Sequence, residues 1–177
     1  MNISVFLSYP KPITKEQEYF IENISDFLRK NGLEPRTLGV TDYDMSAPLI
    51  AIRRLMLESN GIITIAFKRT KVIYGKYKLG TSSEIDIKDK WYTSAYCQIE
   101  PAMAFQIGLP ILILREKGVI EEGILEKGVT GAYLPEFDLD LSGVSYLDTQ
   151  EWNDIIKKWE GFVRTVYASK GNPPKLY

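Results

Sequence analysis

The sequence predicts a single α/β domain with a mostly parallel, doubly wound sheet and helices on both of its faces. Short apolar runs alternate with segments whose apolar residues recur at helical spacing, and the runs at 62–67 and 110–114 are almost entirely apolar. Such runs are typical of strands buried on both faces. The alternation is typical of parallel strands joined by right-handed helical crossovers. The length of 177 residues fits one domain, which we expect to span residues 1–177.

The first third of the chain predicts a strand, a helix and an edge strand. Residues 3–7 form an apolar run that reads as a buried first strand. Thr14 and Gln17 form a capping box for a helix that an Asn-Gly pair should end. Residues 33–38 are a weaker strand candidate, and the proline among them indicates an edge position.

The rest of the chain predicts three more helices and a long insert. Ser46 can cap the second helix, with Pro48 in its first turn and an apolar stripe that begins at Leu49. An insert occupies about 68–92, and the next helix starts near Glu100. Loops with short helical turns should follow over 118–140. Asp148 and Glu151 cap a last helix at about 149–167, and residues 169–177 should form a loose tail.

The composition excludes several classes of function. The chain contains no histidine, which excludes Ser-His-Asp and Cys-His catalysis and histidine-ligated metal sites. The net charge of −1 selects neither nucleic acid nor an anionic membrane. Neither a G-x-G-x-x-G loop nor a Walker motif is present, which argues against a dehydrogenase and a P-loop NTPase. Acid–base chemistry would therefore fall to carboxylates, tyrosine or lysine.

The most informative segment is Ser94-Ala95-Tyr96-Cys97-Gln98-Ile99-Glu100, which leads into a helix and the apolar strand after Pro110. Together with the opening strand that ends in Ser8-Tyr9, it resembles the TIR domain family. That family carries a phrase of Ser, any residue, Trp-Cys, two residues and Glu, and Tyr96 replaces the tryptophan here. The resemblance covers roughly residues 3–116 and implies a flavodoxin-like, TIR-like sheet. It also implies that Glu100 is the catalytic residue for cleaving NAD⁺ at the nicotinamide–ribose bond.

The same segment is similar to the nucleoside 2-deoxyribosyltransferase family, in which a catalytic glutamate shortly precedes a strand entry like Gly108-Leu109-Pro110. Both families break an N-glycosidic bond. Breaking that bond builds positive charge on the ribose, which a fixed carboxylate can stabilise. The departure from the TIR pattern is Pro101, since proline is disfavoured inside a helix. We therefore expect the helix to begin or to kink near Glu100.

Other candidate substrate-binding residues follow the predicted strands or border the motif, and each has a structural alternative. Ser8 and Tyr9 could line a cleft or form an ordinary turn, and Asp44 lies in a loop that could gate the site or be a solvated turn. Lys68 and Arg69 open a basic run, with Lys71, Lys76 and Lys78, that could hold a pyrophosphate or be a solvated loop. Trp91 and Tyr92 could stack on a base or pack the insert onto the core. We expect Cys97 to be a buried apolar residue rather than a nucleophile.

Three functional hypotheses follow. The first is a TIR-like enzyme that cleaves NAD⁺ or a related nucleotide. The resemblance implies that its product could be an ADP-ribose-type signal in prokaryotic antiviral defence. The second is a nucleoside or nucleotide N-glycosidase or deoxyribosyltransferase, and the third is a non-catalytic module for nucleotide sensing or TIR–TIR assembly.

The partners expected from these hypotheses are a nucleotide, further copies of the chain and an effector protein. NAD⁺ would be a substrate, and we expect neither a cofactor nor a metal. A membrane and a nucleic acid are not expected as partners. The location we expect is cytoplasmic, since the single cysteine, Cys97, permits no intramolecular disulfide.

Overall fold

The structure of the chain, a computed structural model, describes residues 3–170. Its main sheet has five strands, all parallel, in the order β2-β1-β3-β6-β7. The strands are β1 (Ile3–Ser8), β2 (Leu33–Arg36), β3 (Ile62–Ala66), β6 (Ile111–Glu116) and β7 (Glu136–Phe137). The predicted doubly wound α/β class is therefore confirmed. The order reverses between β1 and β3, and in such sheets ligands bind beyond the carboxyl ends of the strands at the reversal.

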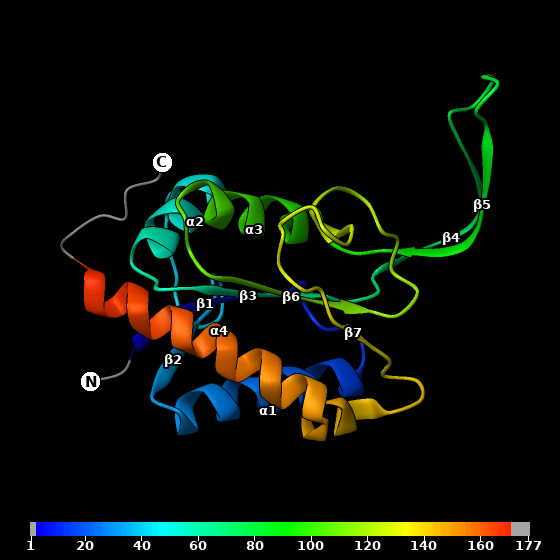
Figure 1. Cartoon of the computed structure of the whole chain (residues 1–177). Coiled ribbons are helices and arrows are strands. Elements are labelled where there is room, and N and C mark those ends of the chain that lie inside the picture. The colour runs from blue at the N-terminus through cyan, green and yellow to red at the C-terminus, as the bar shows by residue number, and fades with distance from the viewer. Residues whose placement is uncertain (1–2, 171–177) are drawn as a thin grey trace.

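Helices cover both faces of this sheet (Figure 1). One face carries α1 (Lys15–Lys30) and α4 (Gln150–Ser169), and the other carries α2 (Pro48–Leu57) and α3 (Tyr96–Gln106). Two short 3-10 helices, η1 (Gly123–Leu125) and η2 (Gly143–Asp148), lie in the connections. Among residues 3–170, no helix has the length and the apolar character needed to cross a membrane. The predicted tail lies almost entirely outside the described residues.

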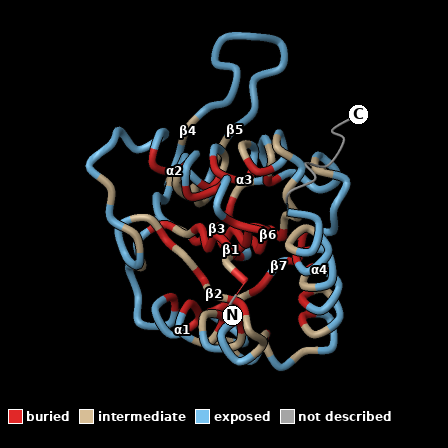
Figure 2. Tube along the Cα trace, turned by 90° about the vertical axis from the view of Figure 1, so that its left-hand side faces the viewer, coloured by how far each residue is buried: buried red, intermediate tan, exposed pale blue. Residues whose placement is uncertain are grey.

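Buried residues concentrate on the strands and on the helix faces that meet them (Figure 2). Phe20 of α1 stacks on Phe137 of β7 with ring centroids 4.4 Å apart, and Phe67 meets both rings edge-on. Trp152 and Trp159 of α4 are buried in the same cluster. The opposite face has smaller apolar clusters under α2 and α3. These two packed layers hold the carboxyl edge of the sheet in place.

The capping signals were correct at some helix ends and wrong at others. Thr14 caps α1 and accepts from the backbone N–H of Gln17, as predicted. The prediction for α2 is wrong, because Ala47 is its N-cap and Ser46 instead donates its backbone N–H to Asp44. The α2 stripe is also wrong at Leu49, which is exposed.

The cap predicted for the last helix is wrong as well. Thr149, rather than Asp148 or Glu151, is the N-cap of α4, and its side chain accepts from the backbone N–H of Trp152.

The insert forms an antiparallel hairpin of β4 (Thr70–Tyr77) and β5 (Ile85–Tyr92), which the sequence did not predict as strands. Its base is bound to the body, because the backbone N–H of Trp91 donates to Gly118 and that of Ile120 donates to Trp91. Its far end projects away from the body beyond the α2 and α3 layer (Figure 1).

Candidate active site

Glu100 belongs to α3 and lies on the face of this helix that packs on the sheet, next to the carboxyl end of β1. The buried residues of α3 are Cys97, Glu100, Pro101 and Ala104, and this spacing places them on one face of a helix. That face packs on the sheet, so only 8% of Glu100 is exposed. The hydroxyl of Ser8, the last residue of β1, donates a buried hydrogen bond to Oε2 of Glu100. The structure thus joins two residues that are 92 positions apart and that the sequence singled out separately.

Burial dominates the electrostatics of Glu100. Removal from water raises the pKa of its carboxyl to about 7, and the hydrogen bond from Ser8 acts in the opposite direction. A carboxyl in this range exists in both protonation states near neutral pH. It can therefore act as a proton donor or as a fixed negative charge within a weakly hydrated site.

The expected start of this helix is wrong. α3 begins at Tyr96 and continues through Pro101, so Glu100 is its fifth residue and lies outside the first turn. A carboxylate favoured only by the helix dipole would sit in that first turn. The dipole alone therefore does not account for the position of Glu100, which is buried and bonded to a strand.

Thr64 is a neighbouring residue that the sequence analysis missed. It pairs with Ser8 in the parallel register of β1 and β3, so the two side chains share a face of the sheet. Thr64 is fully buried, and its hydroxyl has no hydrogen-bond partner within the described part of the chain. The sequence did offer one indication of a role for Thr64, because it is the one polar residue in the apolar run at 62–67.

A second group of candidates lies further out on the same edge. Lys68 and Trp91 line a pocket of about 430 Å³ together with Gln17 and Glu116. Nζ of Lys68 lies 2.8 Å from Oδ2 of Asp140 and 3.7 Å from Oε1 of Glu116. The Glu116 carboxylate accepts from the backbone N–H of Lys68 at 2.8 Å and from Nε2 of Gln17 at 3.3 Å. Burial raises the pKa of Glu116.

Glu116 and Gln17 were not among the predicted site residues. The strand before Glu116 was expected to end at residue 114, two residues too early. The Gln17 side chain was expected only to complete a helix cap. Its Oε1 accepts from the backbone N–H of Ile13, which leaves Nε2 free to reach Glu116.

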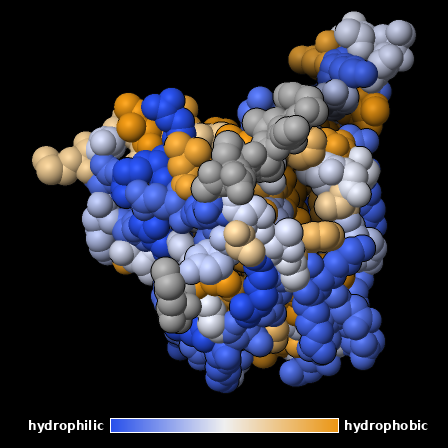
Figure 3. All heavy atoms as spheres, turned by 60° about the vertical axis from the view of Figure 1, so that its left-hand side comes forward, coloured by the Kyte–Doolittle hydropathy of each residue, from blue (hydrophilic) through white to orange (hydrophobic). Residues whose placement is uncertain are grey.

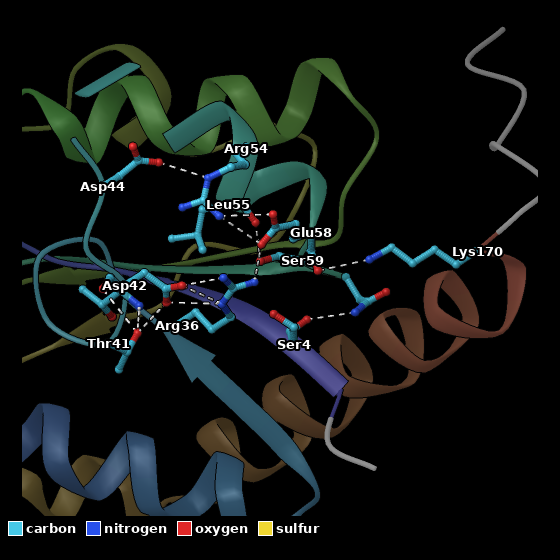
Figure 4. A network of polar contacts seen from close by, with 12 residues as sticks. Ser4, Arg36, Thr41, Asp42, Asp44, Arg54, Leu55, Glu58, Ser59 and Lys170 are labelled. Carbon is cyan, nitrogen blue, oxygen red and sulfur yellow. Dashed lines mark hydrogen bonds and ion pairs between the residues drawn. The ribbon is translucent and has the colours of Figure 1, made fainter. Parts of the chain in front are cut away.

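The remaining candidates lie apart from Glu100. Tyr9 lines a pocket with Thr37, and burial raises its pKa. Asp44 forms an ion pair with Arg54 at 3.0 Å, as Figure 4 shows. A neighbouring pair joins Asp42 to Arg36, so the loop after β2 is bound to α2 and to β2.

Arg69 and Tyr96 are exposed, while Tyr92 lines a pocket with Gln98 beside η1. A fourth pocket lies between α2 and α3. Glu100 lines none of these four pockets of the described residues. Cys97 is buried, as expected, and burial raises the pKa of its thiol to about 11.

Comparison with known proteins gives structural likeness alone. No family model matches the chain, and no curated protein matches it. A structure of the Clostridium botulinum CMP N-glycosidase BcmB is 20% identical, with a TM-score of 0.46, and the match covers 82% of this chain and 98% of that one. The TIR domains in a structure of the activated Roq1 resistosome directly recognizing the pathogen effector XopQ are 13% identical with a TM-score of 0.42, over 93% of this chain and 83% of that one. Both TM-scores are below 0.5, so the case for a function rests on this chain's own residues.

Proposed function

We propose that this protein cleaves the N-glycosidic bond of a nucleotide or nucleoside, with Glu100 at the reaction centre. The observation that carries the proposal is the position of Glu100: a buried carboxyl, oriented by the Ser8 hydroxyl at the carboxyl edge of the sheet, with a pKa raised to about 7. Perturbed carboxyls in such positions are concentrated at functional sites.

The chemistry requires one carboxyl and no histidine. As the C1′–N bond breaks, its electron pair stays with the base and positive charge develops on the ribose. The ionised Glu100 stabilises that charge, and the stabilisation is stronger in a weakly hydrated site than in water. Water then adds to C1′ and loses a proton to solvent. The Ser8 hydroxyl fixes the orientation of the carboxylate.

The first candidate substrate is NAD⁺, whose nicotinamide leaves from a cation and needs little help from an acid. The Lys68–Trp91 pocket offers an aromatic ring for the base of such a dinucleotide, and its phosphates would have to replace Asp140 and Glu116 as the partners of Lys68. A role in prokaryotic antiviral defence, with an ADP-ribose-type product, would be the biological setting of this activity.

The raised pKa of Glu100 favours a second candidate, a nucleoside or nucleotide whose neutral base needs protonation to leave. Near pH 7 a fraction of Glu100 is protonated and can donate to such a base. This candidate includes deoxyribosyl transfer, in which another base rather than water accepts the sugar.

A third candidate, a non-catalytic nucleotide-sensing or assembly module, is favoured by the small exposed fraction of Glu100. Substrate can reach a carboxyl that is 8% exposed only if α3 or a neighbouring loop moves. A nucleotide that binds without turnover would support this candidate.

Product analysis by chromatography and mass spectrometry tests the proposal. Concentrated protein is incubated with NAD⁺ and, separately, with a panel of nucleosides and nucleotides. We expect Glu100→Gln to lower base release by about 100-fold or more, as removal of one transition-state-stabilising group does elsewhere. Glu151→Gln is the matched control, because Glu151 is an exposed residue in the first turn of α4.

The identity of the released base distinguishes the first two candidates. Nicotinamide selects the first, and cytosine or another neutral base selects the second. If the wild type and Glu100→Gln release base at equal rates, Glu100 is not at the reaction centre. If neither turns over any substrate, the third candidate remains, and bound nucleotide is then measured directly.

A further inference from the structure

Thr64 carries a hydroxyl that the packing of the protein leaves without a partner. Polar side chains ordinarily meet water, and hydrophilic atoms cover much of the face of the body that Figure 3 shows. Thr64 is instead fully buried, and its hydroxyl has no hydrogen-bond partner among residues 3–170. Such a hydroxyl costs free energy that valine, a side chain of nearly the same shape, would not cost. Packing alone therefore does not account for a threonine at this position.

Thr64 lies on the face of the sheet that α3 covers, between two residues whose neighbours on α3 are known. Because the side chains of a strand alternate between faces, Ile62, Thr64 and Ala66 point to the same side of β3. Ile62 shares an apolar cluster with Ala104 of α3, and Ala66 shares another with Cys97 of α3. The helix therefore runs over β3 from the level of residue 66 back to the level of residue 62.

Glu100 lies on the stretch of α3 that crosses Thr64. The Cys97 thiol fixes the starting point, because it donates to the backbone carbonyl of Ile65 at 3.8 Å. Glu100 is three residues further along α3, about 4–5 Å, and Thr64 is two residues back from the end of β3, about 6–7 Å. Ser8, which pairs with Thr64 in the register of β1 and β3, already donates to Glu100. Two hydroxyls on adjacent strands therefore lie beneath the same part of α3.

The carboxyl of Glu100 has fewer donors than its ionised form can use. Among the described residues its hydrogen bond comes from Ser8 alone, whereas the two oxygens of a carboxylate can accept about four. Hydrogen bonds to an ionised group are also roughly twice as strong as those between neutral groups. Rotation about the Cα–Cβ bond of Thr64 exchanges the positions of its hydroxyl and its methyl group. The hydroxyl can therefore turn towards Glu100 when the carboxyl loses its proton.

Charged and titratable groups also lie on the elements around α3 and on α3 itself: Arg53, Arg69, Arg115, Glu121, Glu122 and Cys97. Arg115 is paired with Glu121 at 2.7 Å. Cys97 stays neutral near pH 7, because burial raises the pKa of its thiol to about 11. The pKa of Glu100 is set by burial and by the hydrogen bond from Ser8. A further donor would therefore be visible in the titration of Glu100.

We propose that Thr64 is a positioning residue that donates a second hydrogen bond to the ionised form of Glu100. Ser8 and Thr64 then hold the carboxylate from two adjacent strands and fix the direction of its negative charge. The inference rests on the proposed function for its chemical meaning, because the ionised carboxylate is the form that stabilises positive charge on the ribose. The hydrogen bond itself belongs to the folded chain and is measurable without substrate.

NMR of the glutamate carboxyl carbons measures the titration of Glu100 in the substrate-free protein, and Glu100→Gln identifies its resonance. We expect Thr64→Val to lower the acid dissociation constant of Glu100 about tenfold, in line with the strength of a hydrogen bond to a charged group. Thr64→Ser keeps the hydroxyl and should titrate close to the wild type. Ile62→Val is the packing control, because it shortens a buried side chain on the same face of β3 and should leave the dissociation constant unchanged.

The proposal and the proposed reaction fail in different ways. An unchanged dissociation constant in Thr64→Val would overturn the proposal, as would an equal change in Ile62→Val. If the constant falls but the wild type releases no base from any nucleotide, the hydrogen bond stands and the proposed reaction fails. If base is released, its pH profile should move to higher pH in Thr64→Val and stay in place in Thr64→Ser. A profile that does not move in Thr64→Val would show that Thr64 does not position the reacting carboxylate.

Discussion

Replacing Glu100 with Gln should change how stability depends on pH. The pKa of Glu100 is about 7 in the folded chain, against an ordinary value of 4.5. The folded state therefore holds a proton that the unfolded state loses. As pH rises from about 4.5 to about 7, the unfolded chain gains stability relative to the folded one. At 1.36 kcal/mol per pKa unit, a difference of about 2.5 corresponds to about 3 kcal/mol of folding stability lost above pH 7.

Glutamine keeps the shape and can still accept the hydrogen bond from Ser8, but it does not ionise. We expect Glu100→Gln and the wild type to have similar stability at pH 4.5, and the variant to be more stable by up to about 3 kcal/mol at pH 8. In a chain of this size that difference corresponds to a Tm higher by about 6–12 °C.

Guanidinium unfolding of both proteins from pH 4.5 to pH 8 measures this effect. The informative quantity is the difference between the two proteins' unfolding free energies at each pH. This difference cancels the contributions of other carboxyls such as Glu116, whose pKa is also raised by burial. A difference that stays constant with pH would show that Glu100 ionises normally. The buried position of the carboxyl, and the chemistry built on it, would then be refuted.

Three further outcomes are expected. Ser8→Ala should raise the pKa of Glu100 further, because it removes the hydrogen bond that lowers it, and the alkaline shift should appear in the pH profile of base release. An unshifted pH profile would show that the Ser8 hydroxyl does not lower the pKa of Glu100. Phe137→Ala should destabilise the fold by about 3–5 kcal/mol, since the ring is buried and stacked on Phe20 at 4.4 Å; chemical unfolding measures this, and a loss below about 1 kcal/mol would contradict it. Cys97 should react with a thiol reagent far more slowly in the native protein than in denaturant, because burial raises its pKa to about 11, and comparable rates would contradict its burial.

The parallel core was predictable because its signals are local. The run at 62–67 is apolar throughout except for Thr64, and Thr14 carries a standard helix cap, so each element follows from neighbouring residues. β7 was not predictable in this way. It has two residues, and it is a strand only because Arg115 and Glu116 pair with it from β6. The hairpin was missed because charged residues interrupt the apolar residues of both strands.

The two central residues of the candidate site were indicated by the sequence, but neither their geometry nor the neighbouring Thr64, Gln17 and Glu116 were. Glu100 and Ser8 were identified separately, and no sequence pattern joins positions that are 92 residues apart. Pro101 indicated a helix that begins or kinks near Glu100, whereas α3 begins at Tyr96 and continues through Pro101. Burial, and with it the raised pKa of Glu100, depends on that tertiary packing and has no local signal.

The construction of α3 determines how Glu100 can be reached. Side chains of Thr14 and Thr149 cap α1 and α4, but Ala95 provides no side-chain cap for α3. Pro101 also has no N–H, so one hydrogen bond of the helix ladder is missing next to Glu100. A helix built in this way unfolds locally at a lower free energy than its capped neighbours. If the protein is the enzyme proposed above, we expect a ligand to reach Glu100 when the first turns of α3 fray, and the rate of that fraying would then set an upper limit on turnover.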